Sequence, residues 1–233
     1  MIATGRVFVT GGSSGLGAAV ARHYAAAGWR TAIAGRDRMR LNKAASGFAG
    51  SAANIDVYPL DVRDSESLAA ALAAFAPTAV VCCAAVLGRG DVWNGLTPSL
   101  FREVLEINVD GTLNACAAAM RLWRQAQSPG DIVNVSSLAG VRGMQRFEGF
   151  AAYAASKHAV IGLTEALALE ARPFGIRINA IAPGAMLTPM SQALGLSPST
   201  RPDAVVPTIA FLLDRSRSGP LNGSTLEIHC NDA

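Results

Sequence analysis

The chain contains little charge for its 233 residues. Asp, Glu, Lys and Arg together make up 16% of the sequence, only two residues are lysine, and the net charge is +3. Without a Lys/Arg cluster or an aromatic platform, so small a charge gives no reason to expect a nucleic-acid partner. No apolar run reaches the roughly 18 residues that a membrane-spanning helix needs, so we expect no membrane insertion.

Signals for export, disulfides and metal are also missing. The first expected strand, residues 6–10, leads directly into a glycine-rich turn and leaves no room for a cleavable leader. The four cysteines, Cys82, Cys83, Cys116 and Cys230, have neither metal-site nor disulfide-framework spacing. We therefore expect reduced thiols, no metal and a cytoplasmic location.

Hydrophobic residues are plentiful, at 51%, and they alternate between β-rich runs and Ala/Leu-rich helical stretches. Expected strands lie near 6–10, 30–34, 54–60, 78–83, 130–136, 176–182 and 224–229. Expected helices lie near 15–27, 38–47, 65–75, 98–126, 151–172 and 202–213. The pattern predicts an α/β fold in a single domain, 1–233: a doubly wound, Rossmann-like, mostly parallel seven-stranded sheet with helices on both faces. Residues 185–202, rich in Pro, Gly and Ser/Thr, are expected to form a short, loose substrate loop.

A glycine-rich turn, Thr10-Gly-Gly-Ser-Ser-Gly-Leu-Gly17, follows the first strand and opens the first helix. Gly11, Gly15 and Gly17 would let the backbone turn tightly and approach a pyrophosphate, which the helix N-terminus attracts. An ordinary strand-to-helix turn is the alternative interpretation. The position between strand and helix favours dinucleotide binding.

The end of the second strand bears on the choice of dinucleotide. A carboxylate there would bind a ribose 2′-hydroxyl, but this chain has Gly35 followed by Arg36, which can pair with a 2′-phosphate. This favours NADP(H) over NAD(H), although Arg36 could be a solvated loop residue and Asp37 a helix cap. Asp61, at the end of the third strand, could accept a hydrogen bond from the adenine amine or could cap the next helix.

Tyr153 and Lys157 are four residues apart on an expected helix, so their side chains share a face. An ammonium beside a phenol lowers the phenol's pKa, and a phenol so adjusted can serve as a general acid or base at a carbonyl oxygen. Coincidence is the alternative for so short a motif.

With these elements in order, the chain resembles the short-chain dehydrogenase/reductase family in its compact form. Asn108, in Ile-Asn-Val-Asp-Gly-Thr, is similar to the family's helix asparagine, and Ser137, in Asn-Val-Ser-Ser-Leu-Ala-Gly, to its catalytic serine. The resemblance implies that Ser137 orients the substrate oxygen and Tyr153 transfers the proton. It implies that Lys157 lowers the phenol's pKa and holds the nicotinamide ribose, while Asn108 holds a relay water.

The resemblance also implies a cofactor site that includes the segment covering the nicotinamide, Pro183-Gly184 to Thr188. The expected cofactor-binding residues are Gly11, Ser13, Ser14, Gly15, Leu16, Gly17, Arg36, Asp61, Val62, Ala84, Asn108, Tyr153, Lys157, Pro183, Gly184, Met186 and Thr188.

One segment departs from the family pattern. Where the family usually has Asn-Asn-Ala-Gly, this chain has Cys82-Cys83-Ala84-Ala85. Thiols replace amides and a methyl group replaces a hydrogen, which could loosen the strand or crowd the cofactor.

The functional prediction is an NADP(H)-dependent oxidoreductase that moves hydride between nicotinamide and a carbonyl or secondary alcohol. A non-catalytic NAD(P)-binding sensor or scaffold is the alternative, and a nucleotide-sugar epimerase would need an added domain. The resemblance and the Ala/Leu-rich helices 98–126 and 151–172 favour a homodimer or homotetramer. Mostly apolar candidates suggest an uncharged, hydrophobic substrate: Leu138, Ala139, Val141, Gly143, Met144, Phe147, Phe150, Met190 and Leu194. Arg142 and Arg146 could instead meet an anionic tail.

Overall fold

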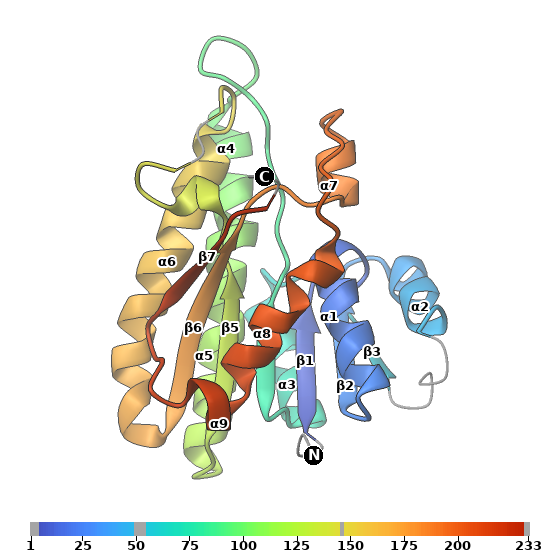
Figure 1. Cartoon of the computed structure of the whole chain (residues 1–233), viewed down its shortest axis with the longest axis vertical. Coiled ribbons are helices and arrows are strands. Elements are labelled where there is room, and N and C mark those ends of the chain that lie inside the picture. The colour runs from blue at the N-terminus through green and yellow to red at the C-terminus, as the bar shows by residue number, and fades with distance from the viewer. Residues whose placement is uncertain (1–4, 49–54, 145–146, 231–233) are drawn as a thin grey trace.

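A seven-stranded, wholly parallel sheet forms the centre of the molecule (Figure 1), as seen in a computed structural model that describes residues 5–48, 55–144 and 147–230. The strands are β1 (Arg6–Thr10), β2 (Arg30–Gly35), β3 (Ile55–Pro59), β4 (Ala79–Cys82), β5 (Gly130–Val135), β6 (Ile176–Pro183) and β7 (Thr225–Ile228). Their order across the sheet is β3-β2-β1-β4-β5-β6-β7. The predicted doubly wound α/β fold is confirmed.

Helices cover both faces of this sheet. The longer ones are α1 (Gly15–Ala26), α2 (Arg38–Ser46), α3 (Ser65–Phe75), α4 (Pro98–Leu105), α5 (Gly111–Gln125), α6 (Ala151–Ala171) and α8 (Val206–Leu213). Two four-residue helices, α7 (Pro189–Gln192) and α9 (Arg215–Ser218), were not predicted. Single turns of 3-10 helix occupy Leu138–Gly140, Arg172–Phe174 and Pro202–Ala204. None of the helices within the described ranges combines the length and apolarity needed to cross a membrane.

Strand β1 shows why a continuous apolar run suits this fold. Val7, Phe8 and Val9 are all fully buried, but they point alternately to opposite faces. Val7 and Val9 join a core with α1 and α8, whereas Phe8 joins a second core with α3, α5 and α6. The sheet is therefore sandwiched between two largely apolar layers.

The predicted helix 98–126 is interrupted. Residues Glu106–Asp110 form a π-helical turn between α4 and α5, with Asn108 at its centre. Such turns widen the helix locally and place a side chain where a regular helix would not. The Thr112 hydroxyl donates to the Asn108 carbonyl at 2.7 Å.

The predicted loop 185–202 and the predicted helix 202–213 also differ in detail. The loop contains α7. The Leu187 N–H donates to the Thr200 carbonyl at 2.8 Å, and this bond joins the two ends of the loop. Helix α8 begins only at Val206, because Pro202–Ala204 forms a separate 3-10 turn and Pro207 suits the first turn of a new helix.

The order of connections reverses between β1 and β4, which are hydrogen-bonded neighbours. Ligands of doubly wound sheets bind beyond the carboxyl ends of the strands at such a point. In Figure 1 this edge faces upward, toward α7, and the N-terminus lies at the opposite edge.

Candidate active site

The glycine-rich turn lies at the carboxyl end of β1 and admits no side chain at its two critical positions. Gly11 has φ +68°, and a Cβ there would lie 2.7 Å from the Ala84 nitrogen. A Cβ on Gly17 would lie 3.2 Å from the Cβ of Cys83, and closer still to the Gly11 carbonyl. The turn is compact because only glycine fits it, and it leaves the backbone open to a ligand.

Helix α1 begins immediately after this turn and presents its N-terminus to the same edge. Ser14 is the N-cap, but its side chain makes no capping hydrogen bond, and the first turn of α1 carries no acidic residue. Unsatisfied N–H groups and the helix dipole favour an anion here. A Cβ on Gly15 would lie 3.4 Å from the Thr188 methyl group, so the segment after β6 reaches this turn.

Arg36 and Asp61 lie beside each other beyond the ends of β2 and β3. The Leu60 N–H donates to the Gly35 carbonyl at 2.9 Å, which brings the two following residues together. Gly35 leaves space next to Ser13, since a Cβ there would lie 4.0 Å from the Ser13 hydroxyl. Arg36 is exposed.

Asp37 and Asp61 differ in whether they cap the helix that follows them. Asp37 does cap α2, accepting from the Arg40 N–H at 3.0 Å. Asp61 does not cap α3; Asp64 does, through the Ser67 N–H at 3.0 Å. Asp61 instead pairs with Arg63, and this hydrogen bond is the main reason why the pKa of Asp61 is lowered.

The unusual Cys82–Ala85 segment keeps its strand in register. Cys82 is paired with Thr10 of β1 and with Asn134 of β5, and the Ala84 N–H donates to the Thr10 hydroxyl at 3.3 Å. The segment packs against Gly11, so the strand is not loosened. Burial raises the pKa of the Cys83 thiol to about 12, which keeps it protonated and unreactive.

Val62, another expected cofactor contact, is buried, and its side chain lies against Gly111 of α5, where no Cβ would fit. Only its backbone is therefore left for a ligand at this edge.

Ser137 and Tyr153 meet at the carboxyl end of β5. Ser137 caps the turn Leu138–Gly140 by accepting from the Ala139 N–H at 3.2 Å, and its hydroxyl lies close enough to the Tyr153 phenol to affect that group's pKa. Burial raises the pKa of Tyr153, and the nearby Ser137 hydroxyl partly opposes this. The phenol is consequently protonated at neutral pH, with the Ser137 hydroxyl beside it.

Lys157 lies in the same buried region but does not act on the phenol as predicted. Its Nζ donates to the Val135 carbonyl at 2.8 Å and lies 5.6 Å from the centre of the Tyr153 ring. Burial lowers the pKa of Lys157 to about 8. The expected lowering of the Tyr153 pKa by Lys157 is wrong for this structure, because burial dominates and the ammonium is directed to a backbone carbonyl.

Asn108 is fully buried, and its amide is used by the protein. Its Oδ1 accepts from the Val86 N–H at 2.8 Å, and its Nδ2 donates to the Val86 carbonyl at 2.9 Å and to the Ser156 hydroxyl at 3.0 Å. Both amide hydrogens are thus engaged, so the side chain ties the segment after β4 to α6. The expected role of holding a water is not supported for this side chain.

Two neighbouring serines were missed by the sequence analysis. The Ser156 hydroxyl donates to the Tyr153 carbonyl at 2.7 Å, and the Ser136 hydroxyl donates to the Lys157 carbonyl at 2.8 Å. Each stands next to an expected catalytic residue, but a serine in such a position has no distinguishing pattern in sequence. Together they fix α6 against β5 and against Asn108.

The segment after β6 is held in place by contacts of Gly184, Met186 and Thr188. The Gly184 N–H donates to the Ile228 carbonyl at 2.9 Å, and a Cβ on Gly184 would lie 3.1 Å from the Cys230 nitrogen. Thr188 caps α7, accepting from the Ser191 N–H at 3.2 Å. The Met186 side chain packs against the core shared by α1 and α8.

Two cavities lie at different ends of the sheet. One of about 530 Å³ adjoins the start of α6 and is lined in part by Trp93, Ala139, Phe147, Phe150 and Ala154. Three of the predicted substrate-contacting residues, Ala139, Phe147 and Phe150, therefore line a cavity together. Leu138, by contrast, is fully buried in the interior, and Arg146 lies outside the described residues.

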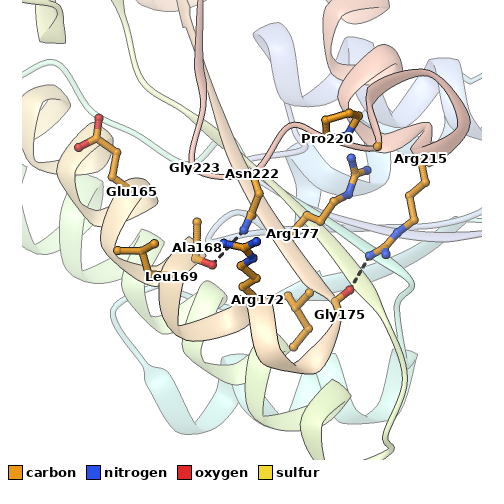
Figure 2. Close-up of a pocket in the computed structure, with 12 residues that line it drawn as sticks. Glu165, Ala168, Leu169, Arg172, Gly175, Arg177, Arg215, Pro220, Asn222 and Gly223 are labelled. Atoms are coloured by element: carbon orange, nitrogen blue, oxygen red, sulfur yellow. Dashed lines mark hydrogen bonds between the residues drawn. The ribbon is translucent and has the colours of Figure 1, made fainter.

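The other cavity, of about 650 Å³, lies at the opposite end of β6, next to Gly175 and Ile176 (Figure 2). Two of its arginines are already engaged: Arg177 and Arg215 both pair with Asp131, at 2.7 and 2.8 Å. This cavity contains none of the expected site residues, and its arginines stabilise the starts of β5 and β6.

Comparison with known proteins identifies the class. A family model described as short chain dehydrogenase matches residues 6–198. Levodione reductase of Leifsonia aquatica is 34% identical over 191 residues, covering 79% of this chain and 70% of the relative. Acetoacetyl-CoA reductase of Paracoccus denitrificans is 32% identical over 236 residues and covers 93% of both chains. Among solved structures, ElxO with NADP bound has a TM-score of 0.86, at 26% identity and 97% coverage of both chains.

The chain therefore belongs to the short-chain dehydrogenase family, as the sequence resemblance predicted. It is an oxidoreductase enzyme of that family, whose named relatives are reductases and dehydrogenases.

Proposed function

We propose that this enzyme uses NADP(H) to interconvert a carbonyl compound and a secondary alcohol, with Tyr153 as the general acid and base. The observation that carries the proposal is the placement of the Ser137 hydroxyl beside the half-buried Tyr153 phenol, at the end of the sheet that also bears the glycine turn. When bound, the nicotinamide supplies or accepts the hydride. The protein's part is to align the substrate and to move one proton.

Each residue's part follows from its contacts. Ser137 orients the substrate oxygen, and Tyr153 donates its phenolic proton to that oxygen in the reductive direction. Burial raises the pKa of this phenol, so the proton that the substrate oxygen would receive is present at neutral pH. Lys157 carries its ammonium toward the same edge and would hold the nicotinamide ribose, while Asn108 and Ser156 fix the position of the helix that carries both residues.

The residues present fit a dinucleotide phosphate. Gly11, Gly15 and Gly17 leave the backbone bare beside the free N-terminus of α1, which suits a pyrophosphate. The exposed Arg36 next to Gly35, with no carboxylate at that strand end, suits a 2′-phosphate. The bound NADP of ElxO is consistent with this preference.

We propose an uncharged, hydrophobic carbonyl substrate. Support comes from the cavity beside α6, where the rings of Phe147 and Phe150 lie 5.7 Å apart and Trp93 is exposed at the rim. The substrates in the relatives' names, levodione and acetoacetyl-CoA, are carbonyl compounds.

Three further expectations accompany the proposal. The strands of the sheet run from residue 6 to residue 228, which supports one domain over the whole chain. The exposed Leu113 and Leu169 on α5 and α6 support a homodimer or homotetramer, which light scattering would test, and a monomer would contradict. The four cysteines lack the spacing of a disulfide framework, which supports a cytoplasmic location.

A panel of ketones, aldehydes and alcohols tests the function, with consumption or formation of NADPH and NADH followed by absorbance. We expect turnover of at least one hydrophobic ketone with NADPH and slower turnover with NADH. Tight NADPH binding without turnover of any member would favour a non-catalytic sensor.

A further inference from the structure

Arg63 lies beside the expected adenosine site, yet no expected role involves it. Its Nε lies 3.1 Å from both carboxylate oxygens of Asp61, and its Nη2 donates to Asp61 Oδ2 at 2.7 Å. On its other side, Nη1 lies 3.6 Å from the carboxylate of Glu106. One guanidinium thus bridges two carboxylates.

Asp61 matters because Arg36 lies next to it. Arg36 follows Gly35 at the end of β2, and the Leu60 N–H is bonded to the Gly35 carbonyl at 2.9 Å. Asp61 is the next residue after Leu60, so its carboxylate lies close enough to Arg36 for the two charges to interact. A 2′-phosphate held by Arg36 would therefore be near a carboxylate.

The charges of this small region decide what it can bind. Arg36 beside an uncompensated Asp61 would be nearly neutral overall, and a phosphate dianion would meet repulsion from the carboxylate as well as attraction from the guanidinium. Because Arg63 forms an ion pair with Asp61, the positive charge of Arg36 remains available to a phosphate. The pairing also leaves Asp61 in place as an acceptor for the adenine amine.

We infer that Arg63 is a specificity-determining residue that screens Asp61, so that Arg36 can receive the 2′-phosphate of NADP(H). The screening acts through Asp61 rather than by direct contact with the ligand. This inference rests on the proposed function, because it assigns a cause to the preference for the phosphorylated cofactor.

Binding of 2′,5′-ADP and of 5′-AMP, measured by calorimetry, tests the inference without any turnover. In Arg63→Gln, we expect affinity for 2′,5′-ADP to fall about 5- to 10-fold while affinity for 5′-AMP changes less than about 2-fold. Adding Asp61→Asn to Arg63→Gln removes the exposed carboxylate and should restore most of the lost preference for 2′,5′-ADP.

Arg30 offers a matched control, since it pairs with Asp56 at 2.9 Å at the opposite ends of the same two strands. Arg30→Gln removes one charge and one ion pair but should leave both affinities unchanged. Equal weakening of both nucleotides in Arg63→Gln, or no restoration by Asp61→Asn, would overturn the screening role. If the unsubstituted protein binds 2′,5′-ADP no better than 5′-AMP, the proposed cofactor preference itself is wrong.

Discussion

The two halves of the candidate site are built in different ways. At the proposed catalytic end, Asn108 and Lys157 are almost fully buried and bonded to backbone groups, and the Ser137 hydroxyl lies beside the Tyr153 phenol. At the adenosine end, Arg36 is exposed, and the side chains of Asp61 and Arg63 are 26% and 40% exposed.

Burial therefore sets the size and the kind of effect expected at each end. A buried polar group that loses its partner costs about 1–3 kcal/mol, whereas an exposed ion pair contributes about 0–1 kcal/mol and is screened by salt. The catalytic end should respond to substitution through stability and proton affinity, and the adenosine end through ligand selectivity.

The largest stability effect is expected at Asn108. Asn108→Ala leaves both backbone groups of Val86 without their partner and should lower the free energy of unfolding by about 4 kcal/mol. Asn114→Ala is the control, because Asn114 lies further along α5, is less buried and bonds the Val62 carbonyl at 3.0 Å; it should cost only about 1 kcal/mol. Chemical denaturation measures both, and equal losses would contradict the comparison.

Lys157 should make the stability depend on pH. Because burial lowers its pKa to about 8 in the folded state, the unfolded chain binds one more proton than the folded chain between pH 8 and the ordinary lysine range. Stability relative to Lys157→Met should therefore rise with pH across this window, by about 3 kcal/mol in total.

The other lysine provides the control for that experiment. Lys43 is exposed on α2, so the stability of the native protein relative to Lys43→Met should show no such rise when thermal unfolding is followed from pH 7 to pH 10.5. A difference between the native protein and Lys157→Met that stays constant over this range would show that the buried ammonium keeps its ordinary proton affinity.

A smaller effect is expected at Arg36. Arg36→Glu should weaken NADPH binding about 10- to 30-fold, or about 2 kcal/mol, and leave NADH binding nearly unchanged, because only NADPH carries the 2′-phosphate. Arg40→Glu, an equal change of charge on the exposed part of α2, should affect both cofactors little. Equal weakening of NADPH and NADH by Arg36→Glu would remove the phosphate role.

The sequence was sufficient for the sheet, because continuous apolar runs such as Val7–Val9 and glycine turns are local signals. It also identified residues that the fold brings to the same end of the sheet, such as Gly15 and Thr188: a Cβ added to Gly15 would lie 3.4 Å from the Thr188 methyl group. The sequence could not predict which partner each polar side chain bonds or where a helix departs from regular geometry. The π-turn around Asn108, the carbonyl partner of Lys157 and the Asp61–Arg63 pair depend on tertiary packing, which residue spacing does not encode.

The most direct test of the central claim is a comparison of Tyr153→Phe with the native protein, in which turnover of a reactive ketone and the Kd for NADPH are both measured. Removing one hydroxyl should leave the Kd within about 3-fold and lower kcat by about 1,000-fold or more, since the proton donor at the substrate oxygen is lost. A variant that retains nearly full kcat would contradict the assignment of Tyr153 as the general acid.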